Sequence, residues 1–152
     1  MKQLILLALL FSLTAITTSN AQTKSTQKET FQATYDDMKA LVQSKTFAYV
    51  GDYVFNSKRR IKLDGNTNTV NINNTEATGQ IEALATTKST KGIKGKISNY
   101  NVSFNDDKQQ ISIEFKVDDT NVNIDIKPNG NAFFTLKSSG TTISQVGRLK
   151  TI

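Results

Sequence analysis

The stretch ISIEFKVDDTNVNIDI, residues 111–126, decides the fold of this 152-residue chain. Apolar side chains occupy every second position on both sides of Asp118-Asp119-Thr120, and most positions between them are polar. A period of two places successive side chains on opposite faces of a β-strand. We therefore expect two antiparallel strands joined by a tight turn, with one face dry and the other wet.

The same alternation continues on either side of this hairpin. Apolar residues alternate over 100–104 and 132–136, short polar turns separate the segments, and a last strand is expected over 141–149. Phe134 and Leu136 share one parity, whereas Phe133 has the other. Five consecutive strands with short connections predict an antiparallel meander.

Upstream, residues 46–55 are apolar on both faces. Phe47, Tyr49, Tyr53 and Phe55 share one parity, with Gly51 between them as a possible bulge or bend. A strand that is apolar on both faces is expected to be central or covered by a helix.

The segment after this strand is harder to interpret. The turn signal Asp64-Gly65 precedes a strand expected over 69–73. Residues 80–85 fit either a strand or a helical turn. Residues 86–96 contain Lys, Thr, Ser and Gly with one apolar residue, a composition typical of a mobile loop.

A helix is predicted over about 27–43. Phe31, Tyr35, Met38 and Val42 recur at spacings of four, three and four, and Thr26 with Glu29 fits a capping box. The fold class is therefore α+β, mostly β, with an N-terminal helix packed on a twisted antiparallel meander sheet. Such a sheet could curl towards a half-barrel.

Residues 1–21 resemble a cleavable signal peptide. Lys2 precedes an apolar run, and a polar stretch then leads to Ala21, the expected cleavage position. The run is too short to span a bilayer, so no transmembrane segment is expected after cleavage. An uncleaved anchor or a buried N-terminal helix is the alternative. Residues 22–26 are then a flexible leader, and 27–152 form a single domain.

The composition bears on the cellular compartment and on the charge of the protein. We expect an exported protein, periplasmic or extracellular, and not a lipoprotein, because the chain has no cysteine to carry a lipid. It carries 19 basic and 13 acidic residues, a formal charge of +6. That charge favours contact with anionic surfaces, although general solubility is the simpler explanation.

Several chemistries are excluded or unsupported. Without histidine or cysteine the chain cannot form a Ser-His-Asp or Cys-His nucleophile, and zinc sites of the usual kind are not expected. We assign no catalytic residue, no metal site and no cofactor. The acidic pairs 36–37, 106–107 and 118–119 are interpreted as turn or surface residues. The alternation of Asp64, Asn66 and Asn68 lacks the glycine and glutamate that a calcium loop needs.

Two sets of residues are candidate binding positions. Tyr49, Tyr53 and Phe104 could line an apolar cavity under the helix, although filling the core is the simpler role. Lys88, Lys91, Lys94 and Lys96 could form a cationic arm towards an anionic envelope surface, and a solvated loop is the alternative. No nucleic acid is expected, since no aromatic residues interleave with these lysines.

The chain resembles an uncharacterised family of exported proteins, mostly from Bacteroidota, known as domain of unknown function 4251. The resemblance rests on three short segments: VQSKTF at 42–47, GIKG at 92–95, and NGNA at 129–132 followed by Ile143-Ser144 and Gly147. It covers nearly all of the chain after the signal and implies export and this fold, but no activity. The segment IEALA at 81–85 departs from a Leu-Pro-Tyr-Phe-Gly type segment often present in the family.

Three functional hypotheses remain open at this point. The first is a non-catalytic envelope domain that binds a ligand or a protein partner. The second is a hydrolase of an unfamiliar type that uses carboxylates or a lysine. The third is a structural subunit that pairs through an exposed sheet edge.

Overall fold

The computed structural model describes residues 27–84 and 89–152. The predicted signal peptide and leader, the capping residue Thr26 and Lys88 lie outside these ranges. Within them, no helix combines the length and the apolar character that crossing a membrane requires.

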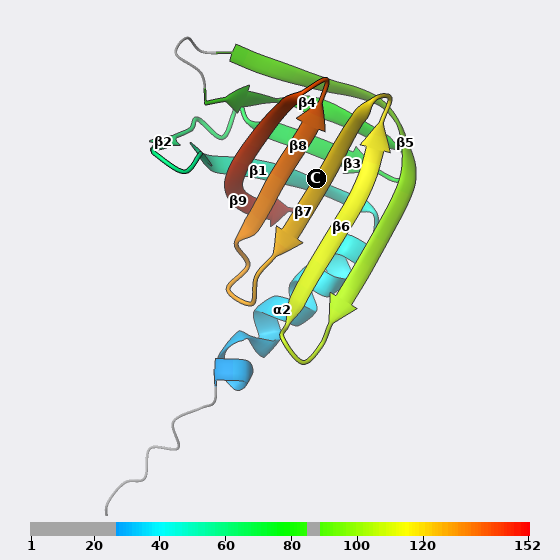
Figure 1. The fold of residues 1–152 in the computed structure, drawn as a ribbon. Coiled ribbons are helices and arrows are strands. Elements are labelled where there is room, and N and C mark those ends of the chain that lie inside the picture. The colour runs from blue at the N-terminus through cyan, green and yellow to red at the C-terminus, as the bar shows by residue number, and fades with distance from the viewer. Residues whose placement is uncertain (1–26, 85–88) are drawn as a thin grey trace, which may run out of the picture.

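One helix and nine strands make up the described chain. Their bounds are α2 (Gln27–Gln43), β1 (Thr46–Phe55), β2 (Arg60–Lys62), β3 (Thr69–Asn73), β4 (Glu76–Ala83), β5 (Ser89–Asn105), β6 (Gln110–Val117), β7 (Thr120–Ile126), β8 (Ala132–Ser138) and β9 (Thr141–Lys150). The strand order is β2-β1-β3-β4-β5-β6-β7-β8-β9, and β1 also pairs with β9. Every pairing is antiparallel, so eight strands close into a barrel and β2 extends it beside β1 (Figure 1).

The predicted α+β fold is confirmed. The sheet curls further than a half-barrel and closes, because β1 pairs with β9. The helix occupies the predicted residues, and β6 to β9 follow the predicted meander. Closure of the barrel depends on β5, which pairs with two strands, and on β1, which pairs with three. β5 pairs with β4 through Ser89–Lys96 and then with β6 through Ile97–Asn105. β1 pairs with β3 through its first half, with β2 through its second half, and with β9 on its other side.

The loop prediction for residues 86–96 was wrong for 89–96. These residues form the first half of β5 and pair in register with β4, from Ser89 opposite Ala83 to Lys96 opposite Glu76. Ile93 is the one large apolar side chain that this half buries. None of the described strands pairs with the other edge of this half of β5, so that edge is open to water. A polar composition suits a strand with an edge exposed in this way.

The interior of the barrel is filled with apolar side chains. Tyr49 stacks on Phe134 with ring centroids 4.6 Å apart, and both are fully buried. The helix α2 lies against the lower end of the barrel in Figure 1 and buries Tyr35 and Val42. The predicted helix face is thus the face that packs on the sheet.

A bulge in β1 reverses which side chains face the core. The register between β1 and β9 shifts between Gly51 and Tyr53. Before the shift Phe47 and Tyr49 point inwards, whereas after it Val54 takes the inward position. An extra residue in one strand moves all later side chains to the opposite face. Tyr53 and Phe55 therefore lie outside, which corrects the prediction that they share a face with Tyr49.

A buried polar network joins the β2–β3 connection to the barrel. The amide nitrogen of Gln145 donates to Asn68 Oδ1 at 3.0 Å and to the Glu82 carbonyl at 2.8 Å. Asn68 Oδ1 also accepts the Glu82 backbone N–H at 2.7 Å. Asp64 accepts the Asn66 N–H at 2.9 Å, as expected of a turn residue. Buried polar groups that are bonded in this way hold the connection in place.

Candidate binding groove on the outer face

The three aromatic residues predicted to bind a ligand lie in three different environments. Tyr49 is inside the barrel, where burial raises the pKa of its phenol. Tyr53 is half-buried on the outside, under the guanidinium of Arg60. Phe104 packs against the helix, with Lys39 Nζ 5.3 Å from its ring centroid. The structure therefore does not bring the three together.

The predicted lysine arm is divided between the two faces of β5. Lys94 and Lys96 share the outward parity, whereas Lys91 stands opposite the buried Ile81, on the inward parity at the rim of the barrel. All three are exposed. Lysine on an unpaired strand edge discourages pairing with another chain, which is a structural role. Contact with an anionic surface stays a prediction.

A different set of residues forms a groove on the outer face of the barrel. Its volume is about 460 Å³, and it is lined by Phe55, Asn56, Arg59, Arg60, Asn131, Phe133 and Val146. The lining comes from β1, the β1–β2 turn, β2, the end of the β7–β8 turn, β8 and β9. The β1 bulge supplies one wall, because it turns Phe55 outwards.

Two phenylalanine rings form a corner in this groove. Phe55 and Phe133 meet edge to face, with centroids 6.3 Å apart and ring planes at 87°. Phe133 is 36% exposed, on a face where the neighbouring strand positions are mostly polar. The strand register continues the apolar row, because Val146 pairs with both Phe133 and Tyr53. Together these side chains form a small contiguous apolar surface on the outside of the barrel.

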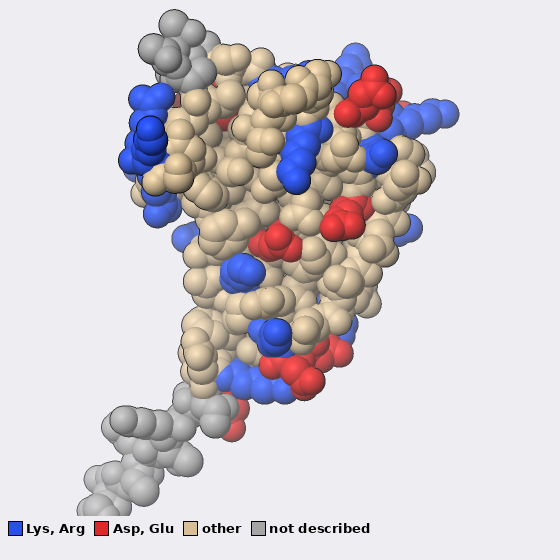
Figure 2. Space-filling view, in the orientation of Figure 1, with Lys and Arg blue, Asp and Glu red and all other residues tan. Residues whose placement is uncertain are grey.

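Cationic side chains border the rings. Arg60 stacks its guanidinium 3.7 Å from the Tyr53 ring centroid, and Lys127 Nζ lies 5.9 Å from the Phe133 centroid. The tight turn before β2 positions the arginines, since Asn56 Oδ1 accepts the N–H groups of Lys58 at 2.8 Å and Arg59 at 3.0 Å. Figure 2 shows Lys and Arg side chains gathered on the side where Figure 1 places β2. The groove thus combines apolar ring surface with positive charge, beside the carboxylate of Asp125, which stands opposite Phe133 and accepts the Ser112 hydroxyl at 2.6 Å.

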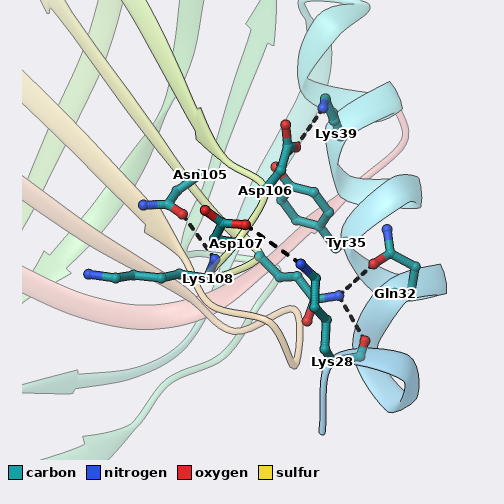
Figure 3. Close-up of polar contacts among 9 residues, drawn as sticks. Lys28, Gln32, Tyr35, Lys39, Asn105, Asp106, Asp107 and Lys108 are labelled. Carbon is teal, nitrogen blue, oxygen red and sulfur yellow. Dashed lines mark hydrogen bonds and ion pairs between the residues drawn. The ribbon is translucent and has the colours of Figure 1, made fainter. Parts of the chain in front are cut away.

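A second polar cluster fastens the helix to the β5–β6 turn (Figure 3). Asp106 Oδ1 accepts the Tyr35 hydroxyl at 2.6 Å and Lys39 Nζ at 2.8 Å. These partners lower the pKa of the Asp106 carboxyl, Lys39 most. Burial, together with the bond to the Asp106 carboxylate, raises the pKa of Tyr35 to about 12.

The same cluster continues towards the start of the helix. Gln109 is 4% exposed and donates its amide to the Lys28 carbonyl and to Gln32 Oε1, each at 2.8 Å. Lys28 also approaches Asp107 at 3.7 Å. Since these groups bond one another, we interpret the cluster as a structural clasp. The acidic pair 106–107, interpreted from sequence as turn residues, holds the helix as well.

Metal binding has no support in the residues that the structure describes. Among them, no three side chains of the His, Cys, Asp or Glu type come together as ligands. The groove was missed at the sequence level because its walls are far apart in the chain. The one available signal was Phe133, an aromatic residue with the parity of the wet face.

Comparisons with known proteins agree on the fold. The family model described as "Domain of unknown function (DUF4251)" matches residues 29–149. A crystal structure of a DUF4251 family protein from Bacteroides eggerthii superposes with a TM-score of 0.66 at 20% identity, covering 82% of this chain and 92% of that chain. The search of curated proteins finds no match. Since the family model spans most of the sequence, this chain belongs to the DUF4251 family.

Proposed function

We propose that this protein is an exported, non-catalytic binding domain of the cell envelope, and that the groove beside β2 is its binding surface. The ligand is an anionic molecule with a flat apolar face. Export rests on the signal pattern of residues 1–21.

The observation that carries the proposal is the Phe55–Phe133 corner beside Arg59 and Arg60. An outward phenyl ring contributes nothing to the core, and aromatic rings offer stacking surface to flat apolar groups. Guanidinium groups bind carboxylate and similar anions through paired hydrogen bonds. The net charge, +6 for the whole chain and +5 once Lys2 is removed with the signal, favours the approach of an anion over a cation.

The two alternative functions have less support. A carboxyl group that acts as the general acid of a hydrolase would need a raised pKa, whereas Lys39 and Tyr35 lower the pKa of Asp106 and hold it in the clasp. Pairing through a sheet edge would use β2 or the first half of β5, and both carry exposed cationic side chains. Like charges on two such edges would repel each other.

Fluorescence titration with 2-naphthoate tests the groove, with neutral 2-naphthamide as the matched probe. We expect 2-naphthoate to bind more tightly than 2-naphthamide. Phe133→Ala should weaken naphthoate binding about tenfold through lost stacking, and Arg60→Gln about tenfold through the lost charged hydrogen bonds.

Lys94→Gln is the control, because it removes one positive charge from the outward face of β5. Equal weakening by Lys94→Gln and Arg60→Gln would mean that net charge, not the groove, attracts the probe. No binding of naphthoate would contradict the proposal. For export, the intact mass of protein from the envelope fraction should correspond to a chain that begins at Gln22.

A further inference from the structure

A second hollow lies on the same outer face as the groove. Its volume is about 500 Å³. Its lining comes mainly from β6, β7 and β8 and includes Glu114, Asn123, Thr135 and Lys137. Thr135 in this hollow and Phe133 in the groove project from the same face of β8, two residues or about 7 Å apart. The two hollows therefore adjoin on the outer face of the barrel, where β6 to β9 lie towards the viewer in Figure 1 and the groove extends from them to β2.

The side chains of the second hollow differ from those of the groove. A row of donors and acceptors in register crosses four strands: Glu114, Asn123 and Thr135, which line the hollow, and Ser144 beside it. The side-chain amide of Asn123 also donates to Glu114 Oε1 at 3.4 Å. Amide, carboxylate and hydroxyl groups bind partners that are both donors and acceptors, as sugar hydroxyls are.

The surface is also long enough for a ligand that consists of several linked units. The distance from β7 to β2 along the sheet is four strand spacings, about 19 Å. An aromatic corner at one end suits the apolar face of a sugar ring, and Arg59, Arg60 and Lys127 suit carboxylates. A single small aromatic acid would leave the polar hollow unused.

We infer that the two hollows form one binding surface for an acidic oligosaccharide, with sugar rings on Phe55 and Phe133 and hydroxyl groups on the polar hollow. This inference rests on the proposed function, since it assigns the ligand class of the same groove. It adds Asn123 and Thr135 as binding residues that a small aromatic anion would not contact.

Calorimetric titration of the purified protein with acidic tetrasaccharides tests this assignment. The panel contains the tetrasaccharides of galacturonate, mannuronate and hyaluronan, with maltotetraose as the neutral match and galacturonate as the single unit. We expect at least one acidic tetrasaccharide to bind more tightly than both maltotetraose and galacturonate. Phe133→Ala should weaken its binding about tenfold, and Asn123→Ala about fivefold.

Asn73→Ala is the matched control, because Asn73 is exposed at the end of β3, outside both hollows. Naphthoate binding that depends on Phe133, without binding of any acidic tetrasaccharide, would overturn this inference and leave the proposed function standing. Tetrasaccharide binding that Asn123→Ala leaves unchanged would restrict the site to the groove and also overturn it. Failure of both probes would refute both proposals.

Discussion

Replacing Gly147 by alanine tests the seam that closes the barrel. Gly147 in β9 stands opposite Gly51 in β1, next to the bulge. A methyl group on Gly147 would overlap with the Val50 carbonyl oxygen and approach Gly51 Cα to 2.8 Å. Both contacts are with backbone, which cannot rotate away as a flexible side chain can. The two strands would have to separate.

The expected cost is large for a single methyl group. Inserting a methylene into a packed interior typically costs ~1–3 kcal/mol, and more where the backbone must shift. We place Gly147→Ala at about 3 kcal/mol or above, since the overlap is with backbone in a paired strand. A domain of this size has ~5–15 kcal/mol of unfolding free energy, so the variant should remain folded but lose a large share of it.

Urea unfolding followed by circular dichroism measures this cost. The control is Gly92→Ala, because a methyl group at Gly92 meets no atom within 4 Å. We expect an unchanged or slightly higher midpoint for Gly92→Ala and a clearly lower midpoint for Gly147→Ala, with similar slopes. Equal midpoints for the two variants would show that β1 and β9 are not in close contact, and would refute the closed seam.

Three further outcomes are expected. Asp106→Asn should lower the urea midpoint at neutral pH. Because the folded pKa of Asp106 is lowered, the difference in urea midpoint between this variant and the unchanged protein should persist above about pH 4. It should vanish as the pH falls through the folded pKa. A constant difference down to acid pH would contradict the clasp. Replacing the three lysines at positions 91, 94 and 96 by valine should cause aggregation, seen by light scattering, because the unpaired edge of β5 becomes apolar; a stable monomer would refute this. Phe134→Ala should cost ~3–5 kcal/mol in urea unfolding, because a fully buried ring stacked on Tyr49 is lost; a loss below 1 kcal/mol would contradict a packed interior.

The parts of the fold that could be predicted are those with local patterns. β6 and β7 follow from alternation around a turn, and α2 follows from four side chains at helical spacing. The first half of β5 could not be predicted, because lysine and glycine are poor strand formers and only Ile93 marks its buried face. Pairing with β4 overrides that local preference.

The groove required information that no local pattern contains. Phe55 faces outwards only because one extra residue at the bulge reverses the parity of β1. Its partner Phe133 is 78 positions along the chain, and the two meet only after β1 has paired with β9. Sequence reasoning named Gly51 as a possible bulge but could not place the rings beyond it.

The bulge links the closure of the barrel to the composition of its outer face. The bulge lies in the β1–β9 pairing that closes the barrel, and Val54 fills the inward position after it, so the core does not need the aromatic residues outside. Elsewhere on the outer face the strands carry polar residues such as Glu114 and Asn123. At Tyr53 and Phe55 the rings add contacts on the outside of the sheet, to Arg60 and Phe133, and take no part in filling the core. The binding role that we propose for these rings would give a reason for aromatic residues at these outward positions.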